Sequence, residues 1–202
     1  GCVSHKRVLD VGFGYGEMLA RLSAANAETY GVEIAQEAVD HARNNAPHAT
    51  VSVASAENMP FEDGFFDIVL CSGVVEHLGK LYAGIGEMHR ILKGSGFLLA
   101  VVPNKNWLGK LYKWAGLNYV SRTLRGLDSN QPIERELGLL GWIHVLNAGG
   151  FVVDFWRPCN VDLKIPFSNI RFRGIPAALC YHFVMRARPR KYGSQSKDGQ
   201  TR

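Results

Sequence analysis

Short apolar runs alternate with amphipathic stretches along the first half of the chain. The runs are rich in Val, Ile, Leu and Phe, as buried strands are, and the stretches between them place apolar residues three and four positions apart, as helices with one buried face do. Strands are predicted at residues 6–11, 29–33, 49–54, 66–72 and 97–102, and helices at residues 15–25, 37–46 and, until Gly94-Ser95-Gly96 interrupts it, 81–92.

Each predicted helix has a face that should pack against a sheet. These faces carry Met18, Leu19 and Leu22 in the first helix, Ala38, Val39 and Ala42 in the second, and Leu81, Ile85, Met88 and Leu92 in the third. Strands separated by helices run parallel, with crossovers on both faces of one doubly wound α/β sheet. A ligand binds such a sheet beyond the carboxyl ends of the strands, where the strand order reverses, and residues 10–16 are expected there.

The alternation pauses after Pro103. Residues 104–137 are interpreted as an inserted segment of helix and loop, rich in Trp, Tyr, Lys and Arg, which forms a candidate substrate lid. A helix that ends at residues 147–150 and strands at 151–156 and 178–185 are predicted after it. Because the insertion is too short to fold by itself, residues 1–187 are expected to form one domain, followed by a basic, disordered tail at 188–202.

Composition restricts the class of protein. The chain has 202 residues, 47% of them hydrophobic and 20% charged, and no apolar stretch reaches the roughly 18 residues that span a membrane. No secretion signal follows Gly1, so a cytoplasmic protein is expected, with a segment missing before Gly1. Cys2, Cys71, Cys159 and Cys180 form no Cys-x-x-Cys pair, and neither a metal site nor a disulfide is predicted.

The net charge of +5 does not indicate a nucleic-acid-binding surface. Residues 186–202 carry six basic residues and one acidic residue, which equals the charge of the whole chain. A charged end with Gly, Ser and Gln is typical of a solvated tail. No nucleic-acid partner is therefore expected, and the sequence leaves the oligomeric state undefined.

The candidate chemistry concentrates in a glycine-rich loop. Residues 8–17 read Val-Leu-Asp-Val-Gly-Phe-Gly-Tyr-Gly-Glu and lead from a strand into a helix, where a backbone that turns tightly can approach a ligand. A purely structural turn also uses glycine. The dinucleotide pattern Gly-x-Gly-x-x-Gly needs its third glycine at position 17, but Glu17 stands there and would repel a pyrophosphate.

Glu33 ends the second predicted strand, about 20 residues after Gly12, where a carboxylate can accept hydrogen bonds from both hydroxyls of a ribose. Because a helix follows, Glu33 has a second interpretation as the carboxylate that caps that helix. The glycine loop before it favours the ribose.

Together these segments resemble the class I S-adenosylmethionine-dependent methyltransferases, in particular the small-molecule enzymes that act on quinones and sterols. The resemblance covers residues 6–103, with weaker support to 156. Its motifs are residues 8–16, Gly31-Val32-Glu33, residues 55–61 (Ser-Ala-Glu-Asn-Met-Pro-Phe), Phe66-Asp67-Ile68-Val69, Val75-Glu76-His77-Leu78 and residues 90–96 (Arg-Ile-Leu-Lys-Gly-Ser-Gly). S-adenosylmethionine carries an ammonium and a sulfonium and no phosphate, so it is compatible with Asp10 and Glu17 beside the loop.

The resemblance implies a fold, a reaction and a set of binding residues. The fold is a doubly wound, Rossmann-like sheet, mostly parallel with an antiparallel last strand, and the reaction is methyl transfer to a small acceptor. The binding residues are Asp10, Gly12 and Gly14 at the methionine end of the cofactor, Glu33 at the ribose, Ser55 and Ala56 at the adenine, and Cys71 and Ser72 along its inner side. Ser55 departs from the Asp that many relatives carry, and its hydroxyl is a weaker acceptor for the adenine amino group.

His77 is the candidate catalytic base. It follows the fourth strand at the cofactor end of the sheet, and a histidine can take up a proton near neutral pH. A second interpretation is that His77 caps or packs against the following helix. His144, in the apolar stretch 142–146, is interpreted as a core histidine.

Other classes of protein fit the motifs less well. A short-chain nicotinamide reductase needs Tyr-x-x-x-Lys, and none of the seven tyrosines has a lysine four residues later. The Asp/Asn-Pro-Pro-Tyr of adenine-amino methyltransferases would follow the fourth strand, where residues 72–75 read Ser-Gly-Val-Val. Pro158-Cys159 matches the dipeptide of cytosine methyltransferases but follows the sixth strand and is interpreted as loop. A cofactor-binding regulatory partner without catalysis remains the alternative function.

The acceptor is expected to be apolar or membrane-associated. Apolar residues at helical spacing alternate with lysines in the predicted lid: Trp107, Leu108, Leu111, Trp114 and Ala115 beside Lys105, Lys110 and Lys113. A basic amphipathic helix of this kind can lie in a membrane surface, and Arg122, Arg125 and the run 170–173 (Ile-Arg-Phe-Arg) would add to the attraction. The alternative is a helix packed over the active site with its lysines in solvent.

Overall fold

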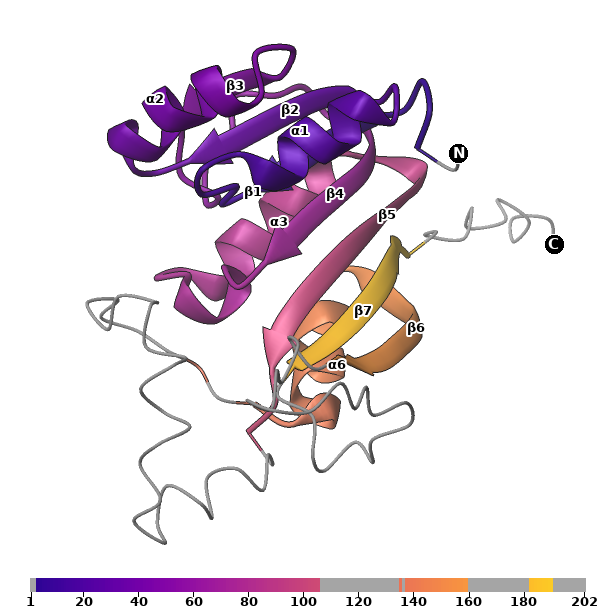
Figure 1. The fold of residues 1–202 in the computed structure, drawn as a ribbon. Coiled ribbons are helices and arrows are strands. Elements are labelled where there is room, and N and C mark those ends of the chain that lie inside the picture. The colour runs from indigo at the N-terminus through magenta and orange to yellow at the C-terminus, as the bar shows by residue number, and fades with distance from the viewer. Residues whose placement is uncertain (1–2, 106–134, 136, 160–181, 191–202) are drawn as a thin grey trace, which may run out of the picture.

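One mixed sheet with helices on both faces organises the chain (Figure 1). The computed structural model describes residues 3–105, 135, 137–159 and 182–190. Its sheet has seven strands in the order β3-β2-β1-β4-β5-β7-β6. They are β1 (Arg7–Val11), β2 (Glu28–Glu33), β3 (Thr50–Val53), β4 (Phe66–Ser72), β5 (Leu92–Pro103), β6 (Phe151–Cys159) and β7 (His182–Pro189).

The strand directions confirm the predicted sheet. The neighbours from β3 to β5 all pair in parallel, whereas β7 runs antiparallel to both β5 and β6. Because β1 lies between β2 and β4, the chain first adds β2 and β3 on one side of β1 and then adds β4 and β5 on the other side. The carboxyl ends of β1 and β4 therefore meet at the switch point, where a doubly wound sheet binds its ligands.

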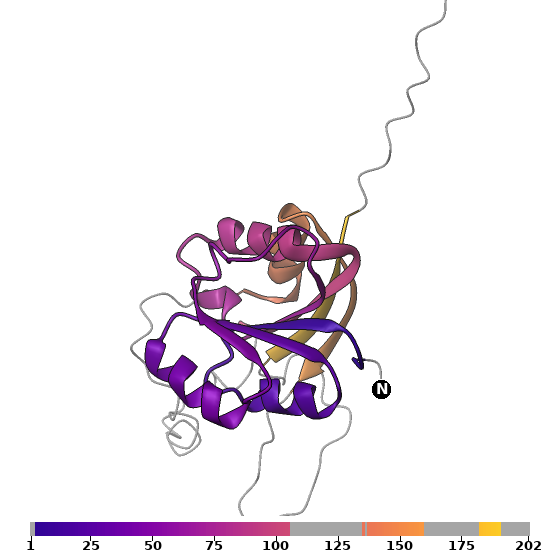
Figure 2. The same ribbon diagram turned by 90° about the horizontal axis from the view of Figure 1, so that it is seen from above.

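Within the described ranges, helices lie on both faces of the sheet (Figure 2). Helices α1 (Glu17–Ala24) and α2 (Gln36–Asn45) lie on one face, and α3 (Leu81–Ile91) and α6 (Leu139–Ala148) lie on the other. A single 3-10 turn, η1 (Val75–His77), follows β4. Among the helices that the structure describes, none combines the length and the apolar character that a membrane span requires.

The main core lies between the sheet and the α3–α6 layer. Alternate residues of β5 point into it and are fully buried, and so are Ile85 and Met88 of α3. Trp142 of α6 is fully buried as well, and its indole N–H donates a hydrogen bond of 2.8 Å to the carbonyl of Pro103. This bond anchors α6 to the carboxyl end of β5, next to the switch point.

The predicted helix faces are confirmed with two exceptions, Met18 and Leu92, of which Leu92 is buried but begins β5 and does not belong to α3. Leu19 and Leu22 of α1 are buried, as are the three predicted residues of α2. Met18 was expected beside Leu19, but its side chain is 45% exposed. Helix α1 begins only at Glu17, so Met18 lies in its first turn and on the side that faces away from the sheet.

Strand ends differ from the predicted boundaries. Gly94-Ser95-Gly96 does not separate α3 from a strand, because β5 begins at Leu92 directly after α3, and a shift of register opposite Phe66–Ile68 accommodates the glycines. Pro158-Cys159, interpreted as loop, forms the end of β6. The pairing of this dipeptide with Phe183 and His182 of β7 extends the strand.

The last strand also extends beyond its predicted end. β7 reaches Pro189, so Arg188 and Pro189 belong to the sheet and not to the tail. Arg186 and Arg188 each donate a hydrogen bond of 2.8 Å to Asp154 of β6. Part of the basic charge assigned to the tail is therefore paired within the sheet. Residues 191–202, and the predicted lid apart from its described ends, lie outside the described residues.

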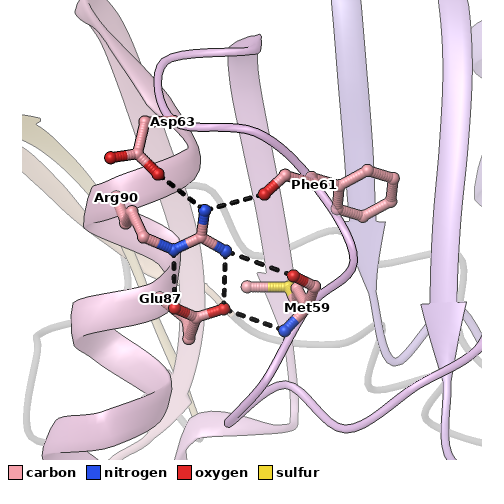
Figure 3. A network of polar contacts seen from close by, with 5 residues as sticks. All are labelled: Met59, Phe61, Asp63, Glu87 and Arg90. Atoms are coloured by element: carbon pink, nitrogen blue, oxygen red, sulfur yellow. Dashed lines mark hydrogen bonds and ion pairs between the residues drawn. The ribbon is translucent and has the colours of Figure 1, made fainter.

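A polar network fixes the irregular connection between β3 and β4 (Figure 3). The Arg90 guanidinium donates from Nε to Glu87 Oε1 at 2.7 Å and from Nη2 to Glu87 Oε2 at 2.8 Å. It also donates to the carbonyls of Phe61 and Met59, at 2.7 and 3.1 Å, and to Asp63 at 2.8 Å. Glu87 in turn accepts the Met59 N–H at 2.8 Å, and its hydrogen bonds with Arg90 lower its pKa. Two side chains of α3 thus hold a loop that has no regular structure.

Replacing Arg90 by lysine should destabilise the protein. Arg90→Lys keeps the positive charge but cannot reach the two carbonyls and the carboxylates together, so we expect the free energy of unfolding to fall by about 1.5–3 kcal/mol. Urea unfolding followed by circular dichroism measures the change. Arg43→Lys is the matched control, because Arg43 pairs with Asp40 on an exposed helix surface, where an ion pair contributes about 0.5 kcal/mol. Equal effects of the two substitutions would contradict the prediction.

Candidate active site

Three glycines with left-handed backbone shape the loop between β1 and α1. Their φ angles are +71° at Gly12, +55° at Gly14 and +86° at Gly16, a region that side chains rarely adopt. A Cβ on Gly12 would overlap Val74 Cγ2, and one on Gly16 would lie 2.9 Å from Ala42 Cβ. A Cβ on Gly14 would meet no atom within 4 Å. Gly12 and Gly16 thus allow close packing, whereas Gly14 faces open space.

Glu33, the last residue of β2, holds this loop in place. Its Oε2 accepts the Gly14 N–H at 3.3 Å, and its Oε1 accepts the N–H groups of Ile34 and Ala35 at 2.7 and 3.4 Å. Ala35 is the N-cap residue of α2. Glu33 therefore binds backbone N–H groups before α2 and at the edge of the glycine loop, but it does not cap the helix, because α2 has no side-chain cap hydrogen bond.

A cavity of about 200 Å³ opens beside Glu33 at the carboxyl ends of β1 and β2. It brings together five of the predicted site residues: Gly12, Glu33, Ser55, Ala56 and His77. The remaining lining residues were not predicted: Val11, Val32, Ile34, Ala54, Glu57, Leu78 and Gly79. The walls are thus mainly apolar, with carboxylates on two sides.

Four predicted residues do not line this cavity. Asp10 is 5% exposed near the end of β1, and Gly14 lies on the loop above it. Cys71 is fully buried in the core, where burial raises the pKa of its thiol, and Ser72 is exposed. Successive residues of a strand point to opposite faces, which explains why Cys71 and Ser72 differ although both stand at the end of β4.

Negative charge collects around the switch point. Burial, and then repulsion by Glu33, raises the pKa of Asp10 from 3.8 to about 7. Glu76 is 4% exposed, and its charge and that of Asp10 add to the rise in the pKa of Cys71. A cationic ligand would be stabilised at this place, and a pyrophosphate would be repelled.

His77 lies in η1 and lines the cavity. Its side chain is 28% exposed, and its Nε2 is 4.0 Å from Glu76 Oε1. His144, in contrast, is exposed, so its interpretation as a core histidine was wrong. Helix α6 buries Trp142, Val145 and Leu146, and His144 falls between them on the outer face.

The wall that carries His77 is fixed from two sides. Glu57 Oε1 accepts the Lys80 N–H at 2.7 Å. On the other side the Arg135 guanidinium donates to the carbonyls of Leu78 and Gly79, the latter at 3.3 Å. The Arg135 N–H also donates to the carbonyl of Glu76 at 3.0 Å. No sequence motif marks Arg135, because its partners are backbone carbonyls 56 to 59 positions away.

Known proteins share both the sequence pattern and the fold. Residues 9–100 match the family model described as a methyltransferase domain. An uncharacterized methyltransferase of Synechocystis is 32% identical over 152 residues, which cover 73% of this chain and 68% of that protein. A ubiquinone biosynthesis O-methyltransferase of Bartonella tribocorum is 29% identical over 122 residues, 58% of this chain, and the chain spans about half of its length (49%).

A solved structure shows the same architecture. The S-adenosylmethionine-dependent methyltransferase of Methanosarcina mazei superposes with a TM-score of 0.69 at 21% identity, over 93% of each chain. With the sequence matches, the chain belongs to the S-adenosylmethionine-dependent methyltransferases, and S-adenosylmethionine is the cofactor of this class.

A side chain at Gly14 should weaken cofactor binding without unfolding the protein. Gly14→Ala would direct a methyl group into the open space above the loop, and we expect the affinity for S-adenosylhomocysteine to fall at least about tenfold in calorimetry. Gly64→Ala is the matched control, because Gly64 has a φ of +64° and similar open space but lies outside the cavity lining. Both variants should lose about 1 kcal/mol of stability from the left-handed backbone. An unchanged affinity of Gly14→Ala would exclude the loop from the site.

Asp10 should make the stability of the ligand-free protein depend on pH. Its pKa is higher in the folded state, about 7 against 3.8, so the folded state holds a proton that the unfolded state has lost. Between about pH 5 and 7 the free energy of unfolding should therefore fall as pH rises, by up to about 1.4 kcal/mol per pH unit, and level off above. Thermal unfolding of the parent and of Asp10→Asn across this range isolates the contribution. Parallel pH profiles would contradict the prediction.

Proposed function

We propose that this chain transfers the methyl group of S-adenosylmethionine to a small acceptor, with the nucleoside of the cofactor in the cavity beside Glu33. The observation that carries the proposal is the gathering of Gly12, Glu33, Ser55, Ala56 and His77 around one cavity at the switch point. These residues come from four separate segments of the chain. Their convergence is what a binding site requires and what a structural glycine turn alone does not.

The cavity suits a nucleoside. Val32, Leu78 and Ala54 offer apolar walls for a flat base, and Glu33 offers carboxylate oxygens to ribose hydroxyls. Sites for whole ligands of drug size measure about 300–1,000 Å³. A cavity of about 200 Å³ therefore accommodates the nucleoside part, while the methionine part extends over Gly14.

The charges near the loop suit the methionine part. The sulfonium and ammonium are cationic, and Asp10 and Glu33 lie at the adjacent ends of β1 and β2. A bound cation would favour the ionised form of Asp10 and offset its repulsion by Glu33. Ser72, exposed at the end of β4, and the backbone of Cys71 are assigned to the inner side of the cofactor.

Catalysis requires little from the protein beyond alignment and proton removal. The cofactor, when bound, supplies an electrophilic methyl group. The chain holds an acceptor in line with that methyl group and excludes water. His77 is assigned as the base that takes the acceptor's proton at Nε2, and Glu76, at 4.0 Å, would stabilise the resulting imidazolium.

We assign an apolar or membrane-associated acceptor to this site. Relatives named as O-methyltransferases of ubiquinone biosynthesis support an acceptor that presents a hydroxyl oxygen. Apart from Lys105, the aromatic and basic residues predicted to contact a membrane fall outside the described residues, so peripheral membrane contact rests on their sequence pattern. Sedimentation with anionic and neutral liposomes at low and high salt, for the parent and for Trp107→Ala/Trp114→Ala, tests it. Equal sedimentation of the two proteins would exclude this contact.

Calorimetry and a labelled-methyl assay test the function itself. S-adenosylmethionine and its demethylated product should bind with micromolar affinity and NAD should not, because acidic residues disfavour pyrophosphate. Labelled S-adenosylmethionine should then mark a product in metabolite and lipid extracts. The alternative, a regulatory protein without catalysis, predicts cofactor binding with no labelled product. Tight binding of NAD would overturn both.

His77→Ala should lower turnover and leave the cofactor in place. Loss of a general base costs about 100-fold or more in kcat, whereas the affinity for S-adenosylhomocysteine should change less than about threefold. His144→Ala is the control, since His144 is exposed on α6. Unchanged turnover of His77→Ala with the acceptor found above would assign His77 to packing.

A further inference from the structure

Ser55, the residue assigned to the adenine, is engaged within its own turn. Its Oγ accepts the Glu57 N–H at 3.1 Å, and its carbonyl accepts the Asn58 N–H at 3.0 Å. Ser55 and Asn58 also form an isolated antiparallel bridge. The hydroxyl oxygen of Ser55 therefore uses one of its two acceptor positions within the turn, and as a neutral group it is a weaker acceptor than a carboxylate.

Glu57 brings a stronger acceptor to the same cavity. It lines the cavity together with Ser55 and Ala56, and its side chain is half-buried. Its Oε1 lies 3.3 Å from the position that a Cβ on Gly79 would occupy, and Gly79 is itself a lining residue. Because Gly79 has no side chain, it does not block the space between the Glu57 carboxylate and the cavity.

The carboxylate of Glu57 is held but not saturated. Within the described part of the chain, the hydrogen bond that it makes is the one from the Lys80 N–H at 2.7 Å. A carboxylate has about four acceptor positions, so the second oxygen can accept a donor from a ligand. The bond to Lys80 fixes the orientation of the group before a ligand arrives, which reduces the entropic cost of binding.

We propose that Glu57 accepts a hydrogen bond from the exocyclic amino group of the cofactor's adenine and makes the site selective for adenine over hypoxanthine. This inference rests on the proposed function, which seats the base of the cofactor in this cavity. Hypoxanthine carries a carbonyl oxygen where adenine carries the amino group, so the same carboxylate would face an acceptor. A buried acceptor facing another acceptor is costly, and the discrimination follows from that mismatch.

A purely structural role for Glu57 predicts something different. If the side chain only fixed the Lys80 N–H, its loss would loosen the wall at residues 78–80 and weaken every ligand of the cavity to the same extent. Selectivity between two bases would not change. The ratio of two affinities therefore separates the two roles, whereas a single affinity does not.

The test compares S-adenosylhomocysteine with S-inosylhomocysteine, in which oxygen replaces the adenine amino group, by calorimetry. The parent should prefer the adenine compound by at least about tenfold, the value of one charged hydrogen bond. Glu57→Gln should lower that preference about tenfold or more, because the amide oxygen can still accept the Lys80 N–H while the amide NH₂ donates to the hypoxanthine carbonyl. Ser55→Ala should keep the parental ratio within about threefold.

Each other outcome overturns the inference. A parent without preference excludes a selective acceptor, and this measurement needs no variant to fold. An unchanged ratio in Glu57→Gln, with S-adenosylhomocysteine still bound, confines Glu57 to the wall and leaves the proposed function intact. A ratio that collapses in Ser55→Ala assigns the amino group to Ser55. Binding of neither compound by the parent overturns the proposed function and this inference with it.

Discussion

The left-handed backbone of the loop between β1 and α1 is the constraint on which the site depends. Gly12 packs directly against Val74, and Gly16 packs against Ala42 of α2, so the loop cannot move outward without losing contact on both sides. A side chain at either position would separate these segments. The tight approach brings the end of β1 close to the segment that carries His77 and, through the Gly14 hydrogen bond, to Glu33. These contacts form the cavity described above, beside Glu33 at the carboxyl ends of β1 and β2.

The buried carboxylates of this site lower the stability of the folded protein. Asp10 and Glu76 are both nearly buried, and burial disfavours ionised carboxylates. The raised pKa of Asp10 results mainly from the free-energy cost of burying its ionised form. A folded protein tolerates such a group where a ligand of opposite charge restores the balance, and the sulfonium and ammonium of the cofactor of this class are ligands of that kind. The same charges would repel the phosphate groups of the nucleotides that other doubly wound sheets bind.

Loops without regular structure carry much of the cavity, and long-range hydrogen bonds give them a defined shape. Backbone groups of such loops lack partners of their own and must find them elsewhere. Arg90 of α3 binds the carbonyls of Met59 and Phe61, and Arg135 binds those of Leu78 and Gly79. Both arginines use the planar guanidinium to join several acceptors at once. Arg135 thus fixes one wall of the cavity without lining it, and Arg90 fixes the connection that follows the lining residue Glu57.

The sequence by itself determined the order and type of the elements, the parallel sheet and the place of the glycine loop, because periodicity and turn residues act over a few positions. It also singled out Glu33 and His77, which the structure places among the residues that line the cavity. Only the tertiary structure decided that His144 is exposed, that Pro158-Cys159 continues β6 and that Glu57, Leu78 and Gly79 complete the cavity. These outcomes depend on pairing and packing between segments far apart in the chain. A local sequence pattern does not determine which distant residues a given residue contacts.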